Sequence, residues 1–404
     1  MDMVPPKSSD RSYRAYGVHP VRDALDEQGD NLQKTSVSQE DRNETPNATT
    51  KNSTALATVS QLQELLELAT GLLLPYAFQP LTAIETYLPG LASMWPFNIS
   101  SSFNPSKDIH DLSGKVILVT GGNNGLGKET ILQLAKHNPH KIFMASRTES
   151  KARDAIASIK SQTSQNVDIE FLQLDLASLP SIKKAADQVA AHTDRLDILI
   201  LNAGIMAVPS AKTAAGQEIQ LGTNHVGHFL LTKLLLPTLD NTAKKYNPDV
   251  RIISLSSAAW QMAPNIDTIV STNKLIAQKP WTCYGASKAA NIMFAAELAR
   301  RYPQFTSASL HPGLIKTDLY TPNLEVNPIV RYGSLLMGGL MFQTIEAGAL
   351  NQLWLAAGAR KDEIKNGQFY TPVAKVHSNK WATNTKDGKR LWEWTEQELK
   401  NAGY

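Results

Sequence analysis

From about residue 113 onward, the chain alternates short apolar runs with segments of helical spacing. Runs rich in Ile, Leu and Val predict strands at 115–120, 141–146, 169–174, 196–201, 251–255, 307–311 and 368–371. Between them, apolar residues recur with a helical period over 128–137, 181–192, 223–236 and 286–301. Apolar strands that alternate with helices are typical of a parallel sheet covered on both faces. We therefore expect an α/β fold with a doubly wound parallel sheet, in a single domain over residues 107–404.

Two zones before this domain form an N-terminal extension of different character. Residues 1–59 are polar and bury too little apolar surface to offset chain entropy, so we expect a disordered tail. Residues 60–106 are apolar, but prolines at 75, 80, 89 and 96 leave pieces too short to span a bilayer. Two interpretations of 60–106 stay open. It is an interfacial segment on a membrane or lipid-droplet surface, or a short lead-in that packs on the following domain.

Composition narrows the class of protein. The 404 residues carry 40 Lys and Arg against 37 Asp and Glu, and a net charge of +3 does not favour a nucleic-acid partner. One cysteine, Cys283, excludes a disulfide scaffold and a thiolate metal cluster. The first twenty residues hold no apolar signal region, so we expect an intracellular, cytoplasm-facing protein. Peripheral association with the endoplasmic reticulum or lipid droplets stays open through 60–106.

A glycine-rich turn follows the first predicted strand and opens directly into a helix. It comprises Thr120, Gly121, Asn123, Asn124, Gly125, Leu126 and Gly127. Its glycines permit a tight turn, close approach of the backbone to a pyrophosphate, and close contact between helix and strand. The helix N-terminus offers free N–H groups and the positive end of its dipole to phosphates. This placement predicts a dinucleotide site on a Rossmann-type sheet, rather than an ordinary glycine-rich turn.

The end of the second predicted strand bears on which dinucleotide binds. NAD sites usually place Asp or Glu there to bind the ribose hydroxyls, whereas this chain has Ser146 and Arg147. A hydroxyl and a guanidinium suit a 2′-phosphate, which a carboxylate would repel. Lys151 and Arg153 either add to that positive field or are ordinary solvated charges. The expected cofactor is NADP, with NAD as the alternative.

Tyr284 and Lys288 are four residues apart in an apolar stretch of helical character. This spacing places the phenol and the ammonium on one helical face. An isolated phenol has a pKa of about 10 and is a poor acid–base group at neutral pH, but a nearby ammonium favours the phenolate. Tyr284 could then exchange a proton with a carbonyl or alcohol oxygen while hydride moves at carbon.

Taken together, these motifs resemble the short-chain dehydrogenase/reductase family. The resemblance rests on the order of 120–127, 202–204, 224, 256–257 and 284–288, and it covers about 112–398. It implies that Ser257 hydrogen-bonds the substrate oxygen, with the adjacent Ser256 as the other assignment. It also implies that Tyr284 is the general acid–base, and that Lys288 lowers its pKa and binds the nicotinamide ribose. Asn224 would hold a proton-relay water through its backbone.

The resemblance implies further cofactor contacts, most of them just after predicted strands. They are Asp175, Leu176, Asn202, Ala203, Gly204, Pro312, Gly313 and Thr317. Residues 202–204 would line the adenosine side, and 175–176 would contact the adenine. Thr317 would bond the nicotinamide carboxamide and fix which face of the ring transfers hydride.

Two stretches look most like the retinol-dehydrogenase-like branch of the family. They are Asn-His-Val-Gly-His-Phe, from Asn224, and Leu-Trp-Glu-Trp-Thr-Glu, from Leu391. Ser257 and Tyr284 lie 27 positions apart (284 − 257), wider than in compact members, which predicts an inserted loop. Family members often pair through helices that match 223–236 and 286–301, which leaves a homodimer open.

Several conspicuous side chains are expected to pack rather than react. His225 and His228 have no nearby carboxylate or cysteine that would complete a metal site, so helix packing is favoured. Cys283 is expected to be a small buried residue, since hydride chemistry needs no nucleophile. Trp392 and Trp394 are expected to anchor the last helix.

Two apolar segments are expected to wall the substrate pocket. They comprise Trp260, Met262, Ile266, Trp281, Leu319, Tyr320, Leu335, Leu336, Met337, Leu340, Met341 and Phe342. An anionic substrate would lose hydration there without gaining a partner. We therefore expect a lipophilic ketone, aldehyde or alcohol of retinoid, steroid, lipid or polyketide type. The alternatives are a non-catalytic dinucleotide-binding protein, acting as a redox sensor or scaffold, and a membrane-tethered interaction protein that works through 60–106.

Overall fold

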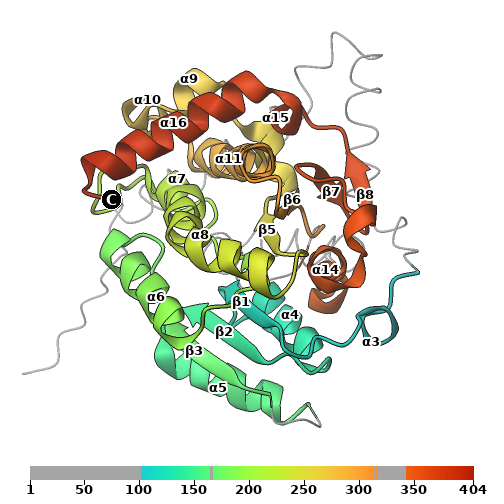
Figure 1. Cartoon of the computed structure of the whole chain (residues 1–404). Coiled ribbons are helices and arrows are strands. Elements are labelled where there is room, and N and C mark those ends of the chain that lie inside the picture. The colour runs from blue at the N-terminus through green and yellow to red at the C-terminus, as the bar shows by residue number, and fades with distance from the viewer. Residues whose placement is uncertain (1–101, 164–166, 314, 316–342) are drawn as a thin grey trace, which may run out of the picture. The chain divides into compact units, whose positions relative to one another are not determined.

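The computed structural model describes residues 102–163, 167–313, 315 and 343–404, and within them the chain forms one eight-stranded sheet (Figure 1). The strand order is β3-β2-β1-β4-β5-β6-β7-β8. The bounds are β1 Val116–Thr120, β2 Lys141–Ser146, β3 Ile169–Gln173, β4 Ile198–Leu201, β5 Arg251–Leu255, β6 Thr306–Leu310, β7 Phe369–Thr371 and β8 Lys375–His377. All pairings are parallel except β7 with β8. The strand order reverses beside β1, which confirms the predicted doubly wound sheet.

Two apolar layers sandwich the sheet, because successive strand residues point to opposite faces. In β1, Ile117 and Val119 belong to one buried cluster, and Val116 and Leu118 belong to the other. Helices α4 Gly125–Ala135, α5 Glu149–Lys160 and α14 Ile345–Leu353 supply the first cluster. Helices α6 Leu179–His192, α8 Gly227–Lys245 and α11 Pro280–Arg301 supply the second (Figure 1). Burial of both faces explains why the strands are apolar throughout.

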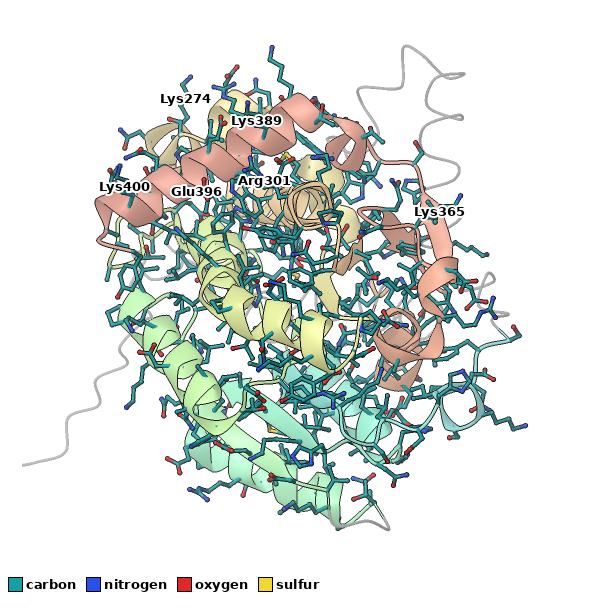
Figure 2. All side chains as sticks on the ribbon, in the orientation of Figure 1. Lys274, Arg301, Lys365, Lys389, Glu396 and Lys400 are labelled. Atoms are coloured by element: carbon teal, nitrogen blue, oxygen red, sulfur yellow. The ribbon has the colours of Figure 1, made fainter. Side chains whose placement is uncertain are left out.

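The last helix, α16 Thr385–Asn401, lies across α11 on the outer side of this second layer (Figure 1). Its Trp392 is stacked with Phe294 of α11 at a centroid distance of 5.9 Å, and it meets Phe229 of α8 edge-on at 4.6 Å. The exposed Lys389 and Lys400 extend from its outer face (Figure 2). The structure thus confirms that Trp392 anchors the last helix, and Trp394 packs against the same core while partly buried.

Two helices differ from the sequence expectation at their N-terminal ends. Helix α11 begins at Pro280, before Tyr284, because proline is well suited to the first turn of a helix. The helix expected from residue 223 is preceded by α7 Ile219–Leu221 and by a π-helical turn, η3 Gly222–Val226. Helix α8 then continues from Gly227 without a break in backbone direction. The π-helical turn places Asn224 at the site described below.

The expected insertion between Ser257 and Tyr284 is present as three short helices. They are η4 Ala258–Met262, α9 Ile266–Ile269 and α10 Thr272–Ile276. The other short elements are α3 Pro105–Asp108, η6 Trp354–Gly358, η7 Lys361–Glu363 and α15 Lys380–Thr383. The expectation for residues 1–59, and that for the segment 60–106 up to residue 101, fall outside the described residues; within 102–106, Phe103 packs against the first cluster. Across the ranges that are described, no helix is long and apolar enough to cross a membrane.

Candidate functional site

The side chains expected to act together gather at one edge of the sheet. The carboxyl ends of parallel strands share an edge, and α/β proteins bind ligands beside it. Thr120 ends β1, and Ser146 ends β2. Asn202 directly follows β4, and Ser257 is the second residue after β5. The structure therefore brings together motifs that lie more than a hundred residues apart in sequence.

The glycine turn between β1 and α4 has the geometry that a diphosphate cradle needs. Gly121 has φ of 66° and Gly125 has φ of 51°, a region that side-chain-bearing residues rarely adopt. A Cβ built on Gly127 would lie 2.2 Å from the Gly121 carbonyl oxygen, so helix and turn approach closely only because residue 127 is glycine. The first turn of α4 leaves N–H groups without intrahelical partners, and these fit the phosphates of a dinucleotide.

Thr120 ties this turn to the segment after β4. Its hydroxyl oxygen accepts hydrogen bonds from the backbone N–H groups of Asn202 and Ala203, both at 3.0 Å. The Asn202 amide nitrogen donates to the Thr120 carbonyl at 2.9 Å. Asn202 Oδ1 is buried and has no partner among the described residues. This acceptor could receive a hydrogen bond from a ligand donor on the side where the adenosine was expected.

The end of β2 presents Ser146 and Arg147 toward the same edge. Ser146 Oγ is buried and unpartnered within the described part of the chain, whereas the Arg147 side chain is exposed. Gln173 holds the Arg147 carbonyl with a hydrogen bond of 3.1 Å. Arg153 pairs with Glu149 one turn away on α5, so its charge is already partly neutralised. Arg147 is therefore the stronger candidate for contact with a 2′-phosphate.

Asp175 and Leu176 lie after β3, where an adenine contact was expected. Asp175 Oδ1 accepts a hydrogen bond from the Ala177 N–H at 3.0 Å, which fixes the turn. Leu176 is buried, and a Cβ on Gly227 would lie 2.3 Å from its carbonyl oxygen. Glycine at the start of α8 therefore lets this turn pack directly against the helix.

Tyr284 and Lys288 point in the same direction from α11, as their spacing predicts. Lys288 Nζ lies 5.5 Å from the centroid of the Tyr284 ring. Lys288 is 3% exposed and donates to the Leu255 carbonyl at 3.1 Å. Burial lowers the pKa of Lys288 to about 8, so the amine still carries its proton at pH 7. A buried cation beside a phenol is suited to stabilise negative charge that forms on that phenol.

Ser256 and Ser257 have different surroundings. Ser256 is 2% exposed, and its hydroxyl donates to the Lys288 carbonyl at 2.7 Å, so it holds α11 against β5. Ser257 is only partly buried, and its Oγ accepts from the Ala259 N–H at 3.2 Å. The Ser257 hydroxyl hydrogen is therefore available to a substrate oxygen, which favours Ser257 for the substrate contact.

Asn224 lies in the π-helical turn and is fully buried. Its side-chain oxygen accepts from the Ile205 N–H at 2.8 Å, and its amide nitrogen donates to the Ile205 carbonyl at 2.9 Å. A Cβ on Gly204 would lie 3.2 Å from Asn224 Oδ1 and 3.4 Å from Lys288 Nζ. Glycine at 204 therefore allows the asparagine, the lysine and the end of β4 to meet.

The turn after β6 is described only in part. Gly313 follows Pro312, has φ of 97°, and its N–H donates to His311 Nδ1 at 3.1 Å. The expectation for Thr317 falls outside the described residues, as do those for residues 319–342. Within the inserted loop, Trp281 packs edge-on to Tyr284 at 6.0 Å, while Trp260 lies near Phe369 at 6.5 Å.

Two side chains near the site are core residues, as was expected for Cys283 but not for Ile266. Ile266 was expected in the substrate wall, but it is 9% exposed and packs with Ile269 and Leu275 beneath the inserted loop. Cys283 is buried, and burial raises its thiol pKa to about 12, which excludes a thiolate at neutral pH. Among the described residues, no group of three or more His, Cys, Asp or Glu could hold a metal ion.

Sequence reasoning did not identify His228 and Ser287 as members of the site. Ser287 Oγ accepts from the Asn224 amide at 2.9 Å and donates to the Tyr284 carbonyl at 2.7 Å. His228 contacts both Asn224 and Thr120. Their proximity in sequence to Tyr284 and Asn224 was the available signal, but the other partner of His228, Thr120, lies at the end of β1.

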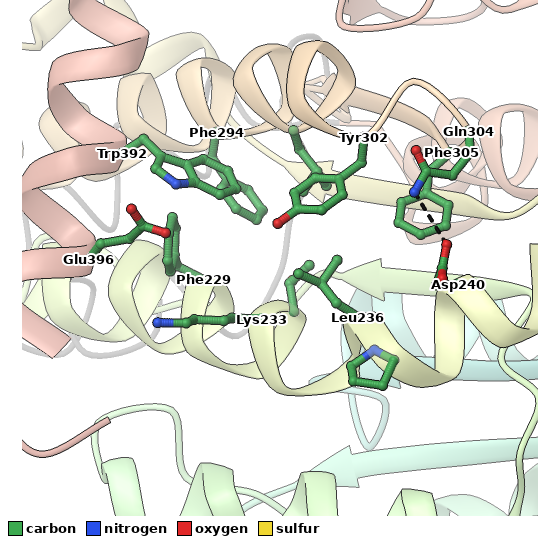
Figure 3. A pocket seen from close by; sticks show the side chains of 13 residues that line it. Phe229, Lys233, Leu236, Asp240, Phe294, Tyr302, Gln304, Phe305, Trp392 and Glu396 are labelled. Atoms are coloured by element: carbon green, nitrogen blue, oxygen red, sulfur yellow. Dashed lines mark hydrogen bonds between the residues drawn. The ribbon is translucent and has the colours of Figure 1, made fainter. Parts of the chain in front are cut away.

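A separate pocket of about 520 Å³ lies between α8, α11 and α16 (Figure 3). Phe229, Phe294, Tyr302 and Trp392 contribute to its largely apolar lining, and Lys233 lies at its edge. Phe294 is ten residues beyond Tyr284 on α11, or roughly 15 Å along the helix axis. This pocket is therefore distinct from the edge of the sheet that holds the Tyr–Lys pair.

The sheet topology, the glycine turn and the paired Tyr284 and Lys288 define a Rossmann-type oxidoreductase. A sequence profile for "short chain dehydrogenase" matches residues 115–326. The chain belongs to the short-chain dehydrogenase/reductase family and is an enzyme acting on CH–OH or C=O groups with NAD or NADP.

Similar proteins support this membership along most of the described chain. A short-chain dehydrogenase/reductase of Armillaria gallica is 36% identical over 322 residues, which cover 77% of this chain and 100% of that protein. Retinol dehydrogenase 12 of Homo sapiens is 33% identical over 291 residues, which cover 70% and 85%. A solved structure from Mycobacterium paratuberculosis has a TM-score of 0.57 at 28% identity and covers 74% and 98%. The retinol-dehydrogenase-like resemblance is thus confirmed.

Proposed function

We propose that this enzyme transfers hydride between NADP(H) and a lipophilic carbonyl or alcohol, with Tyr284 as the acid–base group. The observation that carries the proposal is the buried Lys288 ammonium, 5.5 Å from the centroid of the Tyr284 ring. When bound, the dinucleotide supplies or accepts the hydride. The chain's own residues provide the proton, orient the substrate oxygen and hold the cofactor.

In the direction of reduction, Tyr284 donates its phenolic proton to the substrate oxygen, and in oxidation it accepts that proton. Ser257 donates a hydrogen bond to the same oxygen and orients it. The charge on Lys288 stabilises the phenolate that forms when the proton leaves Tyr284. Asn224 would hold the water that returns a proton to the site, through its backbone carbonyl. Thr120, Gly121, Gly125 and the first turn of α4 would hold the diphosphate.

The preference for NADP rests on Arg147 and on the buried hydroxyl of Ser146, which has no partner among the described residues. A guanidinium binds a phosphate through two parallel hydrogen bonds, and no carboxylate stands at the end of β2 to repel it. Arg147→Ala should raise the Kd of NADPH about ten-fold and leave that of NADH within two-fold. Arg153→Ala is the matched control, because Arg153 already pairs with Glu149. Equal losses for both dinucleotides in Arg147→Ala would contradict the NADP preference.

The substrate class rests on the apolar side chains near the catalytic tyrosine. Trp281 contacts Tyr284 directly, and Trp260 lies one turn after Ser257. Indole rings favour a lipophilic substrate and offer a small acid no charged partner. The similarity to a retinol dehydrogenase supports the same class.

Turnover of a compound panel tests this function. NADPH oxidation would be followed with all-trans-retinal, decanal and a steroid ketone, and with pyruvate as the polar comparison. Tyr284→Phe should lower kcat by roughly 10²–10⁴-fold, the usual contribution of general acid–base catalysis. Tyr302→Phe removes a phenol at the far end of α11 and should leave kcat unchanged. Full turnover by Tyr284→Phe would instead favour a non-catalytic dinucleotide-binding role, and equal turnover of pyruvate would contradict the lipophilic class.

We also propose that residues 60–101 mediate peripheral contact with a membrane or lipid-droplet surface. Support comes from the apolar, proline-interrupted sequence of this segment, which carries no charge from residue 68 to 84 and again from 86 to 101. Flotation with phospholipid vesicles should retain the full-length chain and lose a chain that lacks residues 1–101. Both should oxidise NADPH equally. Loss of activity on deletion would instead support a lead-in that packs on the domain.

A further inference from the structure

The buried histidine on the first turn of α8 bonds to two parts of the proposed site at once. His228 is 1% exposed, and its Nδ1 lies 2.9 Å from the Asn224 carbonyl oxygen. Its Nε2 lies 2.9 Å from Thr120 Oγ1. Asn224 belongs to the π-helical turn beside Lys288, and Thr120 ends the strand that leads into the glycine turn. The imidazole therefore spans the distance between the two proposed halves of the site.

The hydrogen-bonding capacity of the partners assigns the tautomer of His228. A backbone carbonyl can only accept, so Nδ1 must carry the hydrogen that it donates to Asn224. In a neutral ring, Nε2 is then an acceptor, and it receives the Thr120 hydroxyl hydrogen at 2.9 Å, a shorter contact than the 3.4 Å from that hydroxyl to the Ile200 carbonyl oxygen. The Thr120 oxygen keeps its lone pairs for the N–H groups of Asn202 and Ala203. Every group in this arrangement is satisfied with one proton on the ring.

Burial keeps the ring in this neutral form. Desolvation lowers the pKa of His228 to about 4, and the charge on Lys288 acts in the same direction. A protonated ring would place a donor at Nε2 and force Thr120 to release one of its own bonds. The neutral tautomer therefore fits both the geometry and the local charge.

His228 bonds to the backbone of Asn224, and the side chain of the same residue continues the connection to the catalytic helix. The Asn224 side-chain amide donates to Ser287 Oγ at 2.9 Å, and Ser287 Oγ donates to the Tyr284 carbonyl at 2.7 Å. On the other side, the Thr120 hydroxyl fixes the backbone of residues 202 and 203. One series of bonds thus joins the end of β1, the end of β4, the π-helical turn and α11.

We propose that His228 is a positioning residue that fixes the Asn224 carbonyl through one ring nitrogen and the Thr120 hydroxyl through the other. This inference rests on the proposed function, in which Asn224 serves proton transfer and Thr120 serves cofactor binding. Each nitrogen then supports a different step. The bond to Asn224 supports turnover, and the bond to Thr120 supports the affinity for the dinucleotide.

Two substitutions separate the roles, because Asn and Gln each reproduce one ring nitrogen. His228→Asn places an amide at the position of Nδ1 and loses the reach to Thr120. His228→Gln places an amide near the position of Nε2 and loses the donor to Asn224. We expect His228→Asn to raise the Kd of NADPH about three- to ten-fold with kcat within two-fold. We expect His228→Gln to lower kcat about ten-fold with the Kd within two-fold.

The readouts are fluorescence titration with NADPH and the kcat for the panel carbonyl that the unmodified protein reduces fastest. Thr232→Val is the matched control, since Thr232 donates only to the His228 carbonyl within the helix, at 2.8 Å. Thr232→Val should lower Tm without changing the Kd of NADPH or kcat. Parallel changes of Kd and kcat in both His228 variants, in proportion to a loss of Tm, would overturn the proposal and leave a packing role.

Nitrogen NMR of histidine-labelled protein tests the tautomer without any turnover. The resonances lost in His228→Gln identify the ring, and we expect a protonated Nδ1 and an unprotonated Nε2 at pH 7. The opposite tautomer, or a ring with both nitrogens protonated, would overturn the proposal. If Tyr284→Phe retains full turnover while the NMR and NADPH results hold, the proposed chemistry fails and the positioning of Thr120 stands.

Discussion

Mild acid should unfold this domain through three histidines that are buried without charge. Burial lowers the pKa of His225 to about 3, and those of His228 and His311 to about 4. In the unfolded chain each would have a pKa near 6.5. Because the pKa of each histidine is lower in the folded state, these histidines bind protons in the unfolded state at pH values where they stay neutral in the folded state. The stabilisation is complete above pH 6.5 and is lost as the pH falls toward 4.

The loss can be estimated from the linkage relation between protons and stability. Each such histidine costs about 1.4 kcal/mol per pH unit below 6.5, so at pH 5 each costs about 2 kcal/mol and the three cost about 6 kcal/mol. Domains are stable by only about 5–15 kcal/mol, so this loss is a large fraction of the free energy of unfolding. The partly buried His137 and His377 have lowered pKa values and act in the same direction. Ordinary carboxylates titrate near pH 4, below this window. Burial raises the pKa of Glu218, so its protonation in the folded state opposes the histidines in part.

Urea unfolding between pH 7.5 and pH 5, followed by tryptophan fluorescence, measures this effect. At pH values below 6, we expect the free energy of unfolding to decrease by roughly 4 kcal/mol per pH unit. This slope corresponds to about three more protons bound by the unfolded state than by the folded state. His228→Gln removes one titrating group and should reduce the slope to about two protons, whatever its stability at pH 7.5. A slope below one proton, or an unchanged slope in His228→Gln, would refute the reasoning from burial.

Three further predictions address the turn, the paired serines and the last helix. Gly127→Ala should abolish measurable NADPH binding in a fluorescence titration, because its Cβ would lie 2.2 Å from the Gly121 carbonyl oxygen. Ser257→Ala should lower kcat about ten-fold or more with Tm unchanged. Ser256→Ala should instead lower Tm, because it removes one buried hydrogen bond that contributes about 1 kcal/mol to the free energy of unfolding. A kcat loss confined to Ser256→Ala would reverse the assignment. Trp392→Ala should destabilise the domain by about 3–5 kcal/mol in urea unfolding, and a loss under 1 kcal/mol would contradict its role in the core.

The sheet was predictable because its strands are buried on both faces and therefore read as unbroken apolar runs. Strand β8 escaped prediction, since Lys375–His377 is short, partly exposed and without apolar alternation. The start of α11 was placed too late, because the four residues before Tyr284 carry no clear helical period. A proline at the first helical position was the signal for the earlier start.

The Tyr284–Lys288 pair could be predicted because four residues of helix place both side chains on one face. The role of His228 could not be read from the sequence in the same way. Its burial follows from the apolar helix around it, but Thr120 lies 108 positions earlier in the chain. Only the pairing of β1 with β4, and the packing of α8 over them, brings the two together. The choice between Ser256 and Ser257 for the substrate contact likewise needed the hydrogen-bond partners of each hydroxyl, which the sequence of two adjacent serines does not reveal.

The position of α16 has a consequence for how the protein is made. The aromatic rings of α8 and α11 are synthesised well before Trp392, which completes their layer, and buried His225 bonds to Thr395 of the same helix at 3.0 Å. A nascent chain that lacks α16 therefore exposes the apolar surface of α8 and α11. The enzyme should acquire protease resistance only after translation has passed this helix, so a premature stop codon upstream of it would yield a substrate for chaperones and degradation.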